Sequence, residues 1–360
     1  MQEKVRVIIA ASGTGGHLFP AVFIAEEFKK KCPNVELRFI GSGRPLEEKI
    51  LSNKGFEVLT IPTYGVKNLG IAGIARFLAT MPLSFIKTLS IIRKHKPQVV
   101  LGVGGYVTVI PVMAAKLFGI PTWVHEAELK PGLANKVLKD FASKISIAFK
   151  EAELGSHKNA VYTGHPVRQD LRQVTPGIAM GHSPKKILIL GGSQGANALD
   201  EQLPKLLADF KNLHLDIRHQ CREVNVEKVL DAYDEHKLSA QVEYFIDNMA
   251  EAYSWADIII ARSGAGTVME VGVVNRPTIF VPYPHAQGDH QTANAMTLVN
   301  AGKALIVQEG EDFEIKLKTA LEKILDPSTY FAMKLGKYES RSLDAAERIV
   351  NGCLKLIQKT

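Results

Sequence analysis

The stretch VRVIIAASGTGGH, residues 5–17, decides the fold class of this chain. An apolar run rich in β-branched residues is followed at once by a glycine-rich turn that ends in His17. A buried strand that enters a tight turn and then a helix is the usual first unit of an open parallel sheet. Such a turn presents backbone N–H groups and a positive helix end to an anion.

The same device recurs in ILILGGSQG, residues 187–195, about 180 residues further along the chain. At 360 residues the chain is long for one core, so two domains are expected. The repeated turn predicts two similar halves that hold a phosphate-bearing ligand between them.

Short apolar runs alternate with helical patterns in both halves, which predicts two doubly wound parallel sheets. A turn-rich break at residues 163–184 marks the linker. We expect domains at 1–165 and 166–340, and a C-terminal helix within 341–360 that packs back on the first domain. The predicted strands are residues 5–11, 36–40, 58–61, 99–103, 122–125 and 144–148, then 187–190, 215–219, 242–245, 258–261, 278–281 and 304–307.

Composition narrows the function class. The net charge is +7 and the pI about 9.1, which favours anionic partners. Nucleic acid is disfavoured because no basic run is interleaved with stacking aromatics. The three cysteines are not spaced like the ligands of a metal site, and we expect them to be reduced thiols. We expect no signal peptide and no membrane-spanning helix, because Arg76 and Lys87 interrupt the apolar stretch 69–92.

His17 lies in a turn where ligands of open sheets bind, so it is a candidate general base. The alternative is a capping or structural histidine. Glycines at 13, 15 and 16 do not match the dinucleotide fingerprint, and no P-loop lysine follows.

Two polar turns in the second half suit a sugar nucleotide. In RSGAGTVME, residues 262–270, Glu270 lies one turn into a helix, where it can accept both ribose hydroxyls or simply stabilise the helix dipole. The cluster HAQGDHQTAN, residues 285–294, suits sugar hydroxyls better than a metal ion.

Two features of the first half leave alternatives open. His125 and Glu126 end a predicted strand, where they either hold an acceptor group or form a buried orienting pair. Residues 64–96 mix apolar and basic side chains, which suits either an anionic membrane surface or an amphipathic helix packed on the sheet. Residues 70–75 read as a loop-like part of this segment.

Taken in order, the motifs resemble those of the MurG family of peptidoglycan N-acetylglucosaminyltransferases, over nearly the whole chain. The matching stretches are GTGGHLFPA (13–21), GGYV (104–107), HE (125–126), GHPVR (164–168), GGSQGA (191–196), FIDNM (245–249), RSGA (262–265) with Glu270, and DHQTAN (289–294).

The resemblance implies a GT-B fold, in which two Rossmann-like domains flank an interdomain cleft. It implies an inverting transfer of N-acetylglucosamine from UDP-N-acetylglucosamine to the muramyl C4 hydroxyl of undecaprenyl-pyrophosphoryl-muramyl-pentapeptide, lipid I, to give lipid II. No cofactor or bound metal is expected. The enzyme would work as a peripheral protein on the anionic cytoplasmic face of the bacterial cell membrane.

The resemblance also assigns roles to residues. His17 is the expected base and Glu126 the second candidate. The first domain would bind the acceptor, and the Gly13 turn would meet its pyrophosphate. The second domain would bind the UDP-sugar, with Ile246 reading uracil, Glu270 the ribose and Gln291 the sugar hydroxyls. The full set of expected substrate-binding residues is Thr14, Gly15, Gly16, Tyr106, Arg168, Ser193, Ile246, Ala265, Gly266, Thr267, Val268, Met269, Glu270 and Gln291.

Two departures from the family pattern bear on the donor site. Glu128 stands where members commonly have an Asn that touches the donor sugar, which puts sugar choice in doubt. Arg222 replaces a glycine of the family, so we expect a reshaped turn near the nucleotide. The alternatives are a GT-B glycolipid transferase with another acceptor and a non-catalytic sugar-nucleotide-binding protein.

Overall fold

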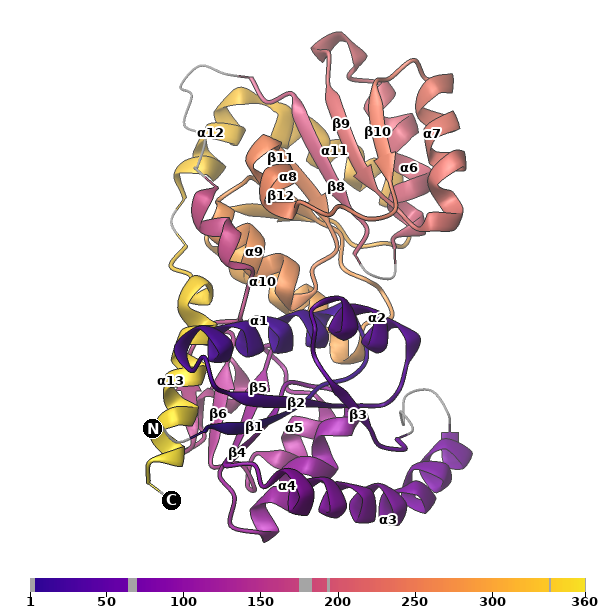
Figure 1. The fold of residues 1–360 in the computed structure, drawn as a ribbon. Coiled ribbons are helices and arrows are strands. Elements are labelled where there is room, and N and C mark those ends of the chain that lie inside the picture. Colours follow the sequence, from indigo (N-terminus) through magenta and orange to yellow (C-terminus); the bar gives the residue numbers. More distant parts are fainter. Residues whose placement is uncertain (1–3, 64–69, 175–182, 193–194, 337, 360) are drawn as a thin grey trace. The chain divides into compact units, whose positions relative to one another are not determined.

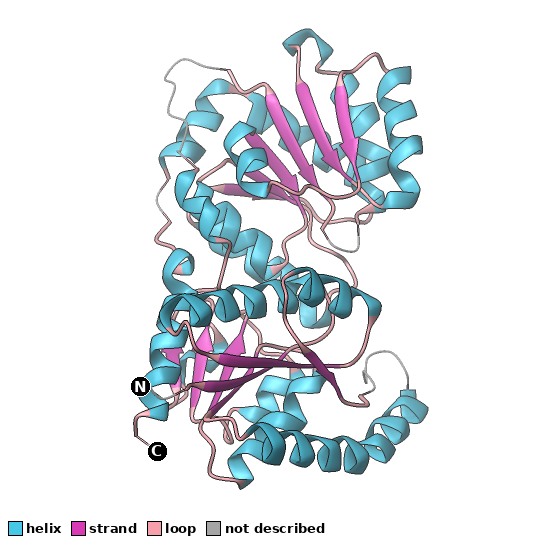
Figure 2. Ribbon diagram, viewed as in Figure 1, coloured by secondary structure: helices cyan, strands magenta, loops and turns pink. Residues whose placement is uncertain are grey.

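The computed structural model describes residues 4–63, 70–174, 183–192, 195–336 and 338–359. The chain forms two compact units, residues 1–168 with 341–360 and residues 169–340. Each unit is an α/β layer structure with helices on both faces of a parallel sheet (Figures 1 and 2).

The first unit contains a seven-stranded sheet in the order β3-β2-β1-β4-β5-β6-β7, with every pair parallel. Its strands are β1 (Arg6–Ala10), β2 (Glu36–Gly41), β3 (Val58–Thr60), β4 (Val99–Gly102), β5 (Thr122–Glu126), β6 (Lys144–Ile147) and β7 (Ala160–Tyr162). Its helices are α1 (Gly15–Lys31), α2 (Pro45–Asn53), α3 (Gly70–His95), α4 (Val109–Leu117), α5 (Leu133–Leu138) and α13 (Ala345–Ile357), with 3-10 turns η1 (Tyr106–Thr108), η2 (Glu153–Ser156) and η7 (Ser342–Asp344).

The second unit contains a six-stranded parallel sheet in the order β10-β9-β8-β11-β12-β13. Its strands are β8 (Lys186–Leu190), β9 (Asp216–Gln220), β10 (Ala240–Glu243), β11 (Ile258–Ala261), β12 (Thr278–Phe280) and β13 (Ala304–Ile306). Its helices are α6 (Asn197–Ala208), α7 (Val226–Glu235), α8 (Met249–Trp255), α9 (Ala265–Val274), α10 (His290–Asn300), α11 (Phe313–Leu325) and α12 (Pro327–Leu335), with 3-10 turns η3 (Gln169–Gln173), η4 (Lys211–Leu213), η5 (Glu223–Asn225) and η6 (Gln287–Asp289).

Buried runs of aliphatic residues explain the central strands. Val7, Ile9 and Leu101 belong to one core cluster, and Ile187, Ile189 and Ile260 belong to the core of the other unit. Because helices cover both faces, these strands need apolar side chains on both sides.

The last helix, α13, completes the core of the first unit. Its residues Ala346, Ile349, Val350 and Cys353 recur on one helical face and are buried in the same cluster as β1. Figure 1 shows α13 beside α1, with which it is in contact. Gly352 lets the helix backbone lie on the Trp123 ring, where a Cβ atom would come within 2.3 Å of a ring carbon.

The structure corrects two predicted elements and adds a strand. Residues 70–75 were expected in a loop-like setting but form the start of α3. The strand expected at 242–245 lies at Ala240–Glu243. The edge strand β7 was not predicted, because Ala160–Tyr162 is only three residues long and Val161 is exposed.

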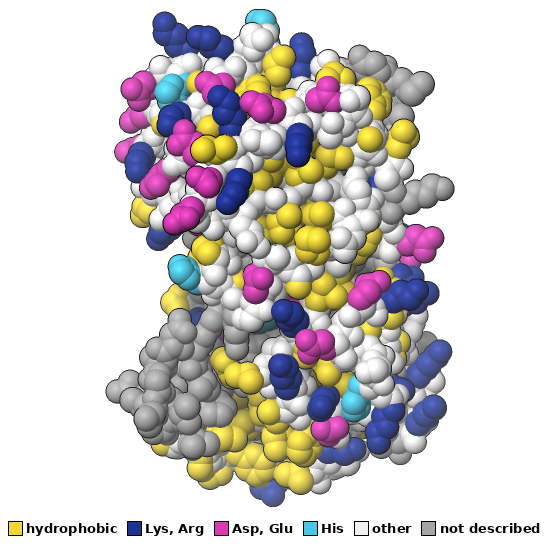
Figure 3. Space-filling model, turned by 180° about the vertical axis from the view of Figure 1, so that it is seen from behind, with side chains coloured by type: hydrophobic (Ala, Val, Ile, Leu, Met, Phe, Trp, Pro, Cys, Tyr) yellow, Lys and Arg dark blue, Asp and Glu magenta, His cyan; other side chains and the backbone are white. Residues whose placement is uncertain are grey.

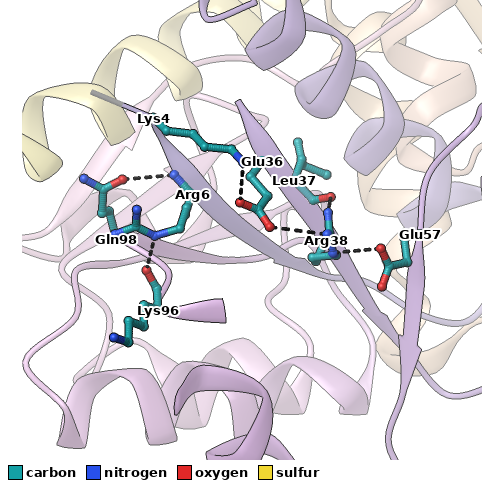
Figure 4. A network of polar contacts seen from close by, with 8 residues as sticks. All are labelled: Lys4, Arg6, Glu36, Leu37, Arg38, Glu57, Lys96 and Gln98. Carbon is teal, nitrogen blue, oxygen red and sulfur yellow. Dashed lines mark hydrogen bonds and ion pairs between the residues drawn. The ribbon is translucent and has the colours of Figure 1, made fainter. Parts of the chain in front are cut away.

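A polar network covers the amino-terminal end of β1 and β2 (Figure 4). Lys4 pairs with Glu36 at 3.0 Å, and the Arg38 guanidinium contacts Glu57 at 2.8 Å and Glu36 at 3.3 Å. The Arg6 side chain donates to the Lys96 carbonyl at 2.8 Å. These contacts lie at the end of the strands away from the residue 12–17 turn, so we interpret the network as structural.

Candidate active site

In both sheets the strand order reverses beside the first strand. In the first unit the chain adds β2 and β3 on one side of β1 and then adds β4 on the other side. In the second unit it adds β9 and β10 on one side of β8 and then β11 on the other. In open parallel sheets ligands bind at the carboxyl ends of the strands at such a switch point. The glycine turns that follow β1 and β8 therefore lie where a ligand site is expected in each unit.

The His17 ring has a defined tautomer in its neutral form. Its Nδ1 lies 3.1 Å from the Ser12 carbonyl oxygen. A carbonyl only accepts hydrogen bonds, so Nδ1–H donates and Nε2 carries the lone pair. This leaves the ring suited to take a proton at Nε2.

The backbone after β4 supports the His17 ring. Gly104 has φ +110°, and a Cβ atom on it would lie 2.4 Å from His17 Cδ2. The Ser12 N–H lies 3.4 Å from the Gly104 carbonyl oxygen, so the turns after β1 and β4 are joined directly. Tyr106 follows at the start of η1 and is half-buried.

His125 is part of a buried histidine pair. Its Nδ1 lies 3.0 Å from Ser146 Oγ and its Nε2 lies 3.1 Å from His165 Nδ1. Burial, with a smaller contribution from the nearby His17, lowers the pKa of His165 to about 3, and the pKa of His125 is also well below its usual value because of burial. Both rings are therefore neutral, and the His125 ring has a hydrogen-bond partner at each of its nitrogens.

Glu126 is 3% exposed and holds the loop that follows β5. Its carboxylate accepts from Glu128 N at 2.9 Å, Gly132 N at 3.2 Å and Asn135 Nδ2 at 3.0 Å. Burial raises the pKa of Glu126 to about 7, and these donors oppose the rise.

Helix α1 begins with an open N-terminus. Thr14 is its N-cap but makes no side-chain cap hydrogen bond, and the first turn contains no acidic residue. Thr14 and Gly16 are exposed, whereas Gly15 is buried. The backbone N–H groups at the start of α1 thus form a positive helix end, and no carboxylate of the helix neutralises it.

Helix α9 begins in the same way after β11. Gly264 is the N-cap without a side-chain cap, and the first turn has no acid. Val268 is the first residue of this helix whose N–H donates to a carbonyl one turn earlier, that of Gly264 at 3.0 Å. The helix start therefore presents the N–H groups of Ala265, Gly266 and Thr267. Val268 and Met269 are 0% and 1% exposed, so their side chains belong to the core.

Glu270 has a partner that the sequence did not reveal. The Tyr253 hydroxyl, from α8, donates to Glu270 Oε2 at 3.0 Å. Tyr253 is 1% exposed, while Glu270 is half-buried. A buried phenol thus fixes the orientation of a carboxylate that still reaches the surface.

Gln291 and Ile246 are two further residues expected to bind the donor. The Tyr283 N–H donates to Gln291 Oε1 at 2.9 Å, which turns the Gln291 NH₂ group away from that contact. Ile246 lies in the loop between β10 and α8, and its side chain is buried. Its backbone N–H and carbonyl make no hydrogen bond within the part of the chain that the structure describes.

The other predicted residues have different outcomes. Arg168 is half-buried and is the last residue of the first stretch of its unit. Ser193 lies outside the described residues. Arg262, in the motif 262–270, is buried and donates to the carbonyls of Val281 at 3.0 Å and Pro282 at 3.2 Å. Arg262 also pairs with Glu309, so it supports the turn from within.

The Arg222 departure does not strain the backbone. Arg222 has φ −70° and ψ 144°, an extended conformation open to any residue. Its side chain lies against Gly195, where a Cβ atom would come within 2.0 Å of Arg222 Cγ.

In the cluster 285–294, Thr292 Oγ1 donates to Asp289 at 2.6 Å. Among the described residues, no group of three His, Cys, Asp or Glu side chains is placed to hold a metal ion.

Comparisons with known proteins agree with this geometry. Residues 7–147 match the glycosyltransferase family 28 N-terminal domain, and residues 186–349 match its C-terminal domain. A relative from Geobacter metallireducens is 34% identical over 357 residues, which cover 96% of this chain and 97% of that one. One from Syntrophus aciditrophicus is 36% identical over 358 residues, covering 98% and 99%. Both are named UDP-N-acetylglucosamine–N-acetylmuramyl-(pentapeptide) pyrophosphoryl-undecaprenol N-acetylglucosamine transferase.

Among solved structures, Acinetobacter baumannii MurG superimposes with a TM-score of 0.78 at 30% identity, covering 99% of this chain and 100% of that one. Two Rossmann-like units with this match confirm the GT-B fold predicted from the sequence. The chain therefore belongs to glycosyltransferase family 28 and, within it, to the MurG family of N-acetylglucosamine transferases.

Proposed function

We propose that this chain transfers N-acetylglucosamine from UDP-N-acetylglucosamine to the C4 hydroxyl of the muramyl sugar of lipid I, with inversion, to form lipid II. The names of its relatives support this reaction. The structural observation that carries it is the pair of uncapped helix starts, α1 and α9, one beside each switch point. Each offers backbone donors to one of two substrates that both carry a diphosphate.

The second unit would hold the donor. The N–H groups of Ala265, Gly266 and Thr267 suit its diphosphate, and Glu270, oriented by Tyr253, suits the two ribose hydroxyls. The unpaired backbone of Ile246 suits the uracil edge, and the NH₂ group of Gln291 suits a sugar hydroxyl. Arg168 and Ser193 are proposed on the resemblance alone.

The first unit would hold the acceptor and the base. We assign the base to His17, because its Nε2 carries the lone pair, whereas Glu126 is buried and bonded to three donors. As the acceptor oxygen bonds to C1 of N-acetylglucosamine, its proton passes to His17 Nε2. The C1–O bond to UDP breaks and its electron pair stays on the diphosphate, whose charge the α9 N-terminus stabilises.

The first unit also has a surface suited to lipid. No helix among the described residues is long and apolar enough to cross a membrane. Helix α4 packs against α3 and α5, and these helices and the turns that follow α4 and α5 expose apolar side chains. Figure 3 shows apolar side chains gathered on this unit beside Lys and Arg. The exposed members are Leu83, Ile86, Leu117, Phe118, Leu133, Val137 and Phe141, with Lys87, Lys116 and Lys136 among them.

The part of α3 whose side chains the structure describes, residues 79–95, favours the membrane interpretation of residues 64–96. Its buried positions are Ser84, Thr88, Ile91 and Ile92, whereas Leu83 and Ile86 are 58% and 64% exposed. Residues 64–69 lie outside the described part of the chain. We propose that this surface places the protein on the anionic cytoplasmic face of the cell membrane.

One assay tests the reaction. The purified protein, UDP-N-acetylglucosamine and a lipid I analogue should give the disaccharide product in the presence of a chelator. No product, or a strict metal requirement, would refute the proposal. UDP-N-acetylgalactosamine and UDP-glucose test the effect of Glu128 on sugar choice.

A single substitution tests the base. H17A should lower kcat by about 100-fold or more, the range of general-base catalysis, with the affinity for UDP unchanged. Equal losses of kcat and UDP affinity would make His17 a binding residue instead.

A further inference from the structure

A buried carboxylate, that of Glu47, lies beside the Gly13 turn. Glu47 lies in the first turn of α2 and is 0% exposed, whereas its neighbour Glu48 is exposed. Buried carboxylates are usually paired with a cation, because burying an unpaired charge is costly. Glu47 makes no ion pair with any residue that the structure describes.

Four hydrogen-bond donors surround Glu47 instead. Its Oε1 accepts from Gly13 N at 3.1 Å and from Ser42 Oγ at 2.7 Å. Its Oε2 accepts from Ser42 N at 2.7 Å and from Gly43 N at 3.1 Å. Every partner donates, which suits an ionised carboxylate. One side chain thus ties the turn after β1 to the turn after β2.

The bond to Gly13 reaches His17 through one peptide group. The Gly13 N–H and the Ser12 carbonyl are the two ends of the same planar unit. The N–H donates to Glu47, and the carbonyl accepts from His17 Nδ1 at 3.1 Å. A carboxylate, a peptide group and an imidazole therefore form one hydrogen-bonded chain, in which each bond strengthens the next.

This peptide group needs an external restraint. Gly13 has φ +106°, and glycine adopts positive and negative φ with similar ease. Rotation of the peptide plane would turn the Ser12 carbonyl away from His17 and release the Nδ1–H tautomer. The bond from Gly13 N to Glu47 opposes that rotation.

We propose that Glu47 is a positioning residue for His17 and acts through the peptide group between Ser12 and Gly13. The proposal rests on the proposed role of His17 as the base. Glu47 then has the task of the carboxylate in a Ser-His-Asp triad, which holds the imidazole tautomer, with a peptide group interposed.

The variant E47Q breaks one bond of this hydrogen-bonded chain, that from Gly13 N to residue 47. The amide NH₂ group cannot accept, and the backbone donors of Ser42 and Gly43 cannot turn around. The Ser42 hydroxyl can rotate and accept, so the NH₂ group takes the Oε1 position, where Gly13 N loses its acceptor. E48Q is the matched control, because it removes the same charge from the next residue without touching either turn.

We expect E47Q to lower kcat by about 10- to 100-fold, while KM for UDP-N-acetylglucosamine and for the lipid I analogue stays within about twofold of wild type. E48Q should match wild type. In an H17A background, E47Q should cause no further loss, because the two residues act as one unit. An unchanged kcat, a rise in acceptor KM alone, or full additivity with H17A would each overturn the proposal.

A spectroscopic measurement keeps the proposal testable if E47Q does not fold. ¹⁵N shifts of the histidine rings in the wild-type protein, with the His17 signal assigned by its loss in H17A, should show the Nδ1–H tautomer. An Nε2–H tautomer would overturn the proposal. If wild type itself shows no transfer, the proposed function fails, and that result is distinct from a failure of Glu47 alone.

Discussion

The contact between Gly104 and the His17 ring gives a prediction whose size can be worked from the structure. A Cβ atom at residue 104 would lie 2.4 Å from His17 Cδ2, and ordinary van der Waals contact begins near 3.4 Å. In G104A the ring must therefore move by about 1 Å. A displacement of that size at a catalytic group costs about 100-fold in rate, which corresponds to about 2.7 kcal/mol.

The expected result is a kcat about 100-fold below wild type, with the affinity for UDP unchanged. Backbone strain is a separate effect, since alanine at positive φ costs about 1–2 kcal/mol. G119A is the control for strain, because Gly119 has φ +69° and a Cβ atom at that residue would meet no other atom within 4 Å. Both variants are assayed well below their unfolding temperatures, with turnover of the lipid I analogue and calorimetric titration of UDP. A G104A enzyme with wild-type kcat would refute the placement of His17 against this backbone, and so would an equal loss in G119A.

Three further results are expected. Y253F removes the hydroxyl that orients Glu270, so it should weaken UDP binding about 10-fold. Binding of a UDP analogue that lacks the ribose hydroxyls should not be weakened. Equal losses for both ligands would contradict the assignment of Glu270 to the ribose. Burial raises the pKa of Glu126 from its ordinary 4.5 to about 7. Between these pH values the folded chain keeps a proton that the unfolded chain releases. The free energy of unfolding therefore falls as the pH rises from about 4.5 to 7. The urea midpoint of wild type relative to E126Q should therefore be lower at about pH 8 than at about pH 5, and a constant difference would contradict the shift. I86E should weaken binding to anionic vesicles at least about 10-fold in sedimentation, whereas S328E, on an exposed residue of the second unit, should not; equal binding by both variants would exclude the α3 surface.

Most of the strands were predictable because their signal is local. Ile258–Ala261 is a continuous apolar run, and the predicted and observed bounds coincide. Both glycine turns follow from the sequence for the same reason. The start of α3 was missed, because Gly70 and Gly73 resemble loop residues when read alone.

The supporting contacts of the site were not predictable, because they join residues far apart in the chain. Glu47 meets Gly13 across 34 residues, and Tyr253 meets Glu270 across 17. Nothing local distinguishes Glu47 from Glu48, yet one is fully buried and the other exposed. Only the pairing of β1 with β2 brings the two turns together, so the assignment needs the fold.

Helix α13 has a consequence for the order in which the chain can fold on the ribosome. The second unit is continuous in sequence, so all its residues have been synthesised once residue 340 has been added. The first unit begins earlier but still lacks Ile349, Val350 and Cys353 at that moment, so part of the apolar surface of α1 and β4, which α13 contacts, is still uncovered. The unit that is translated first is therefore the last to be completed, and its apolar surface stays exposed to water and prone to aggregation until α13 has been synthesised.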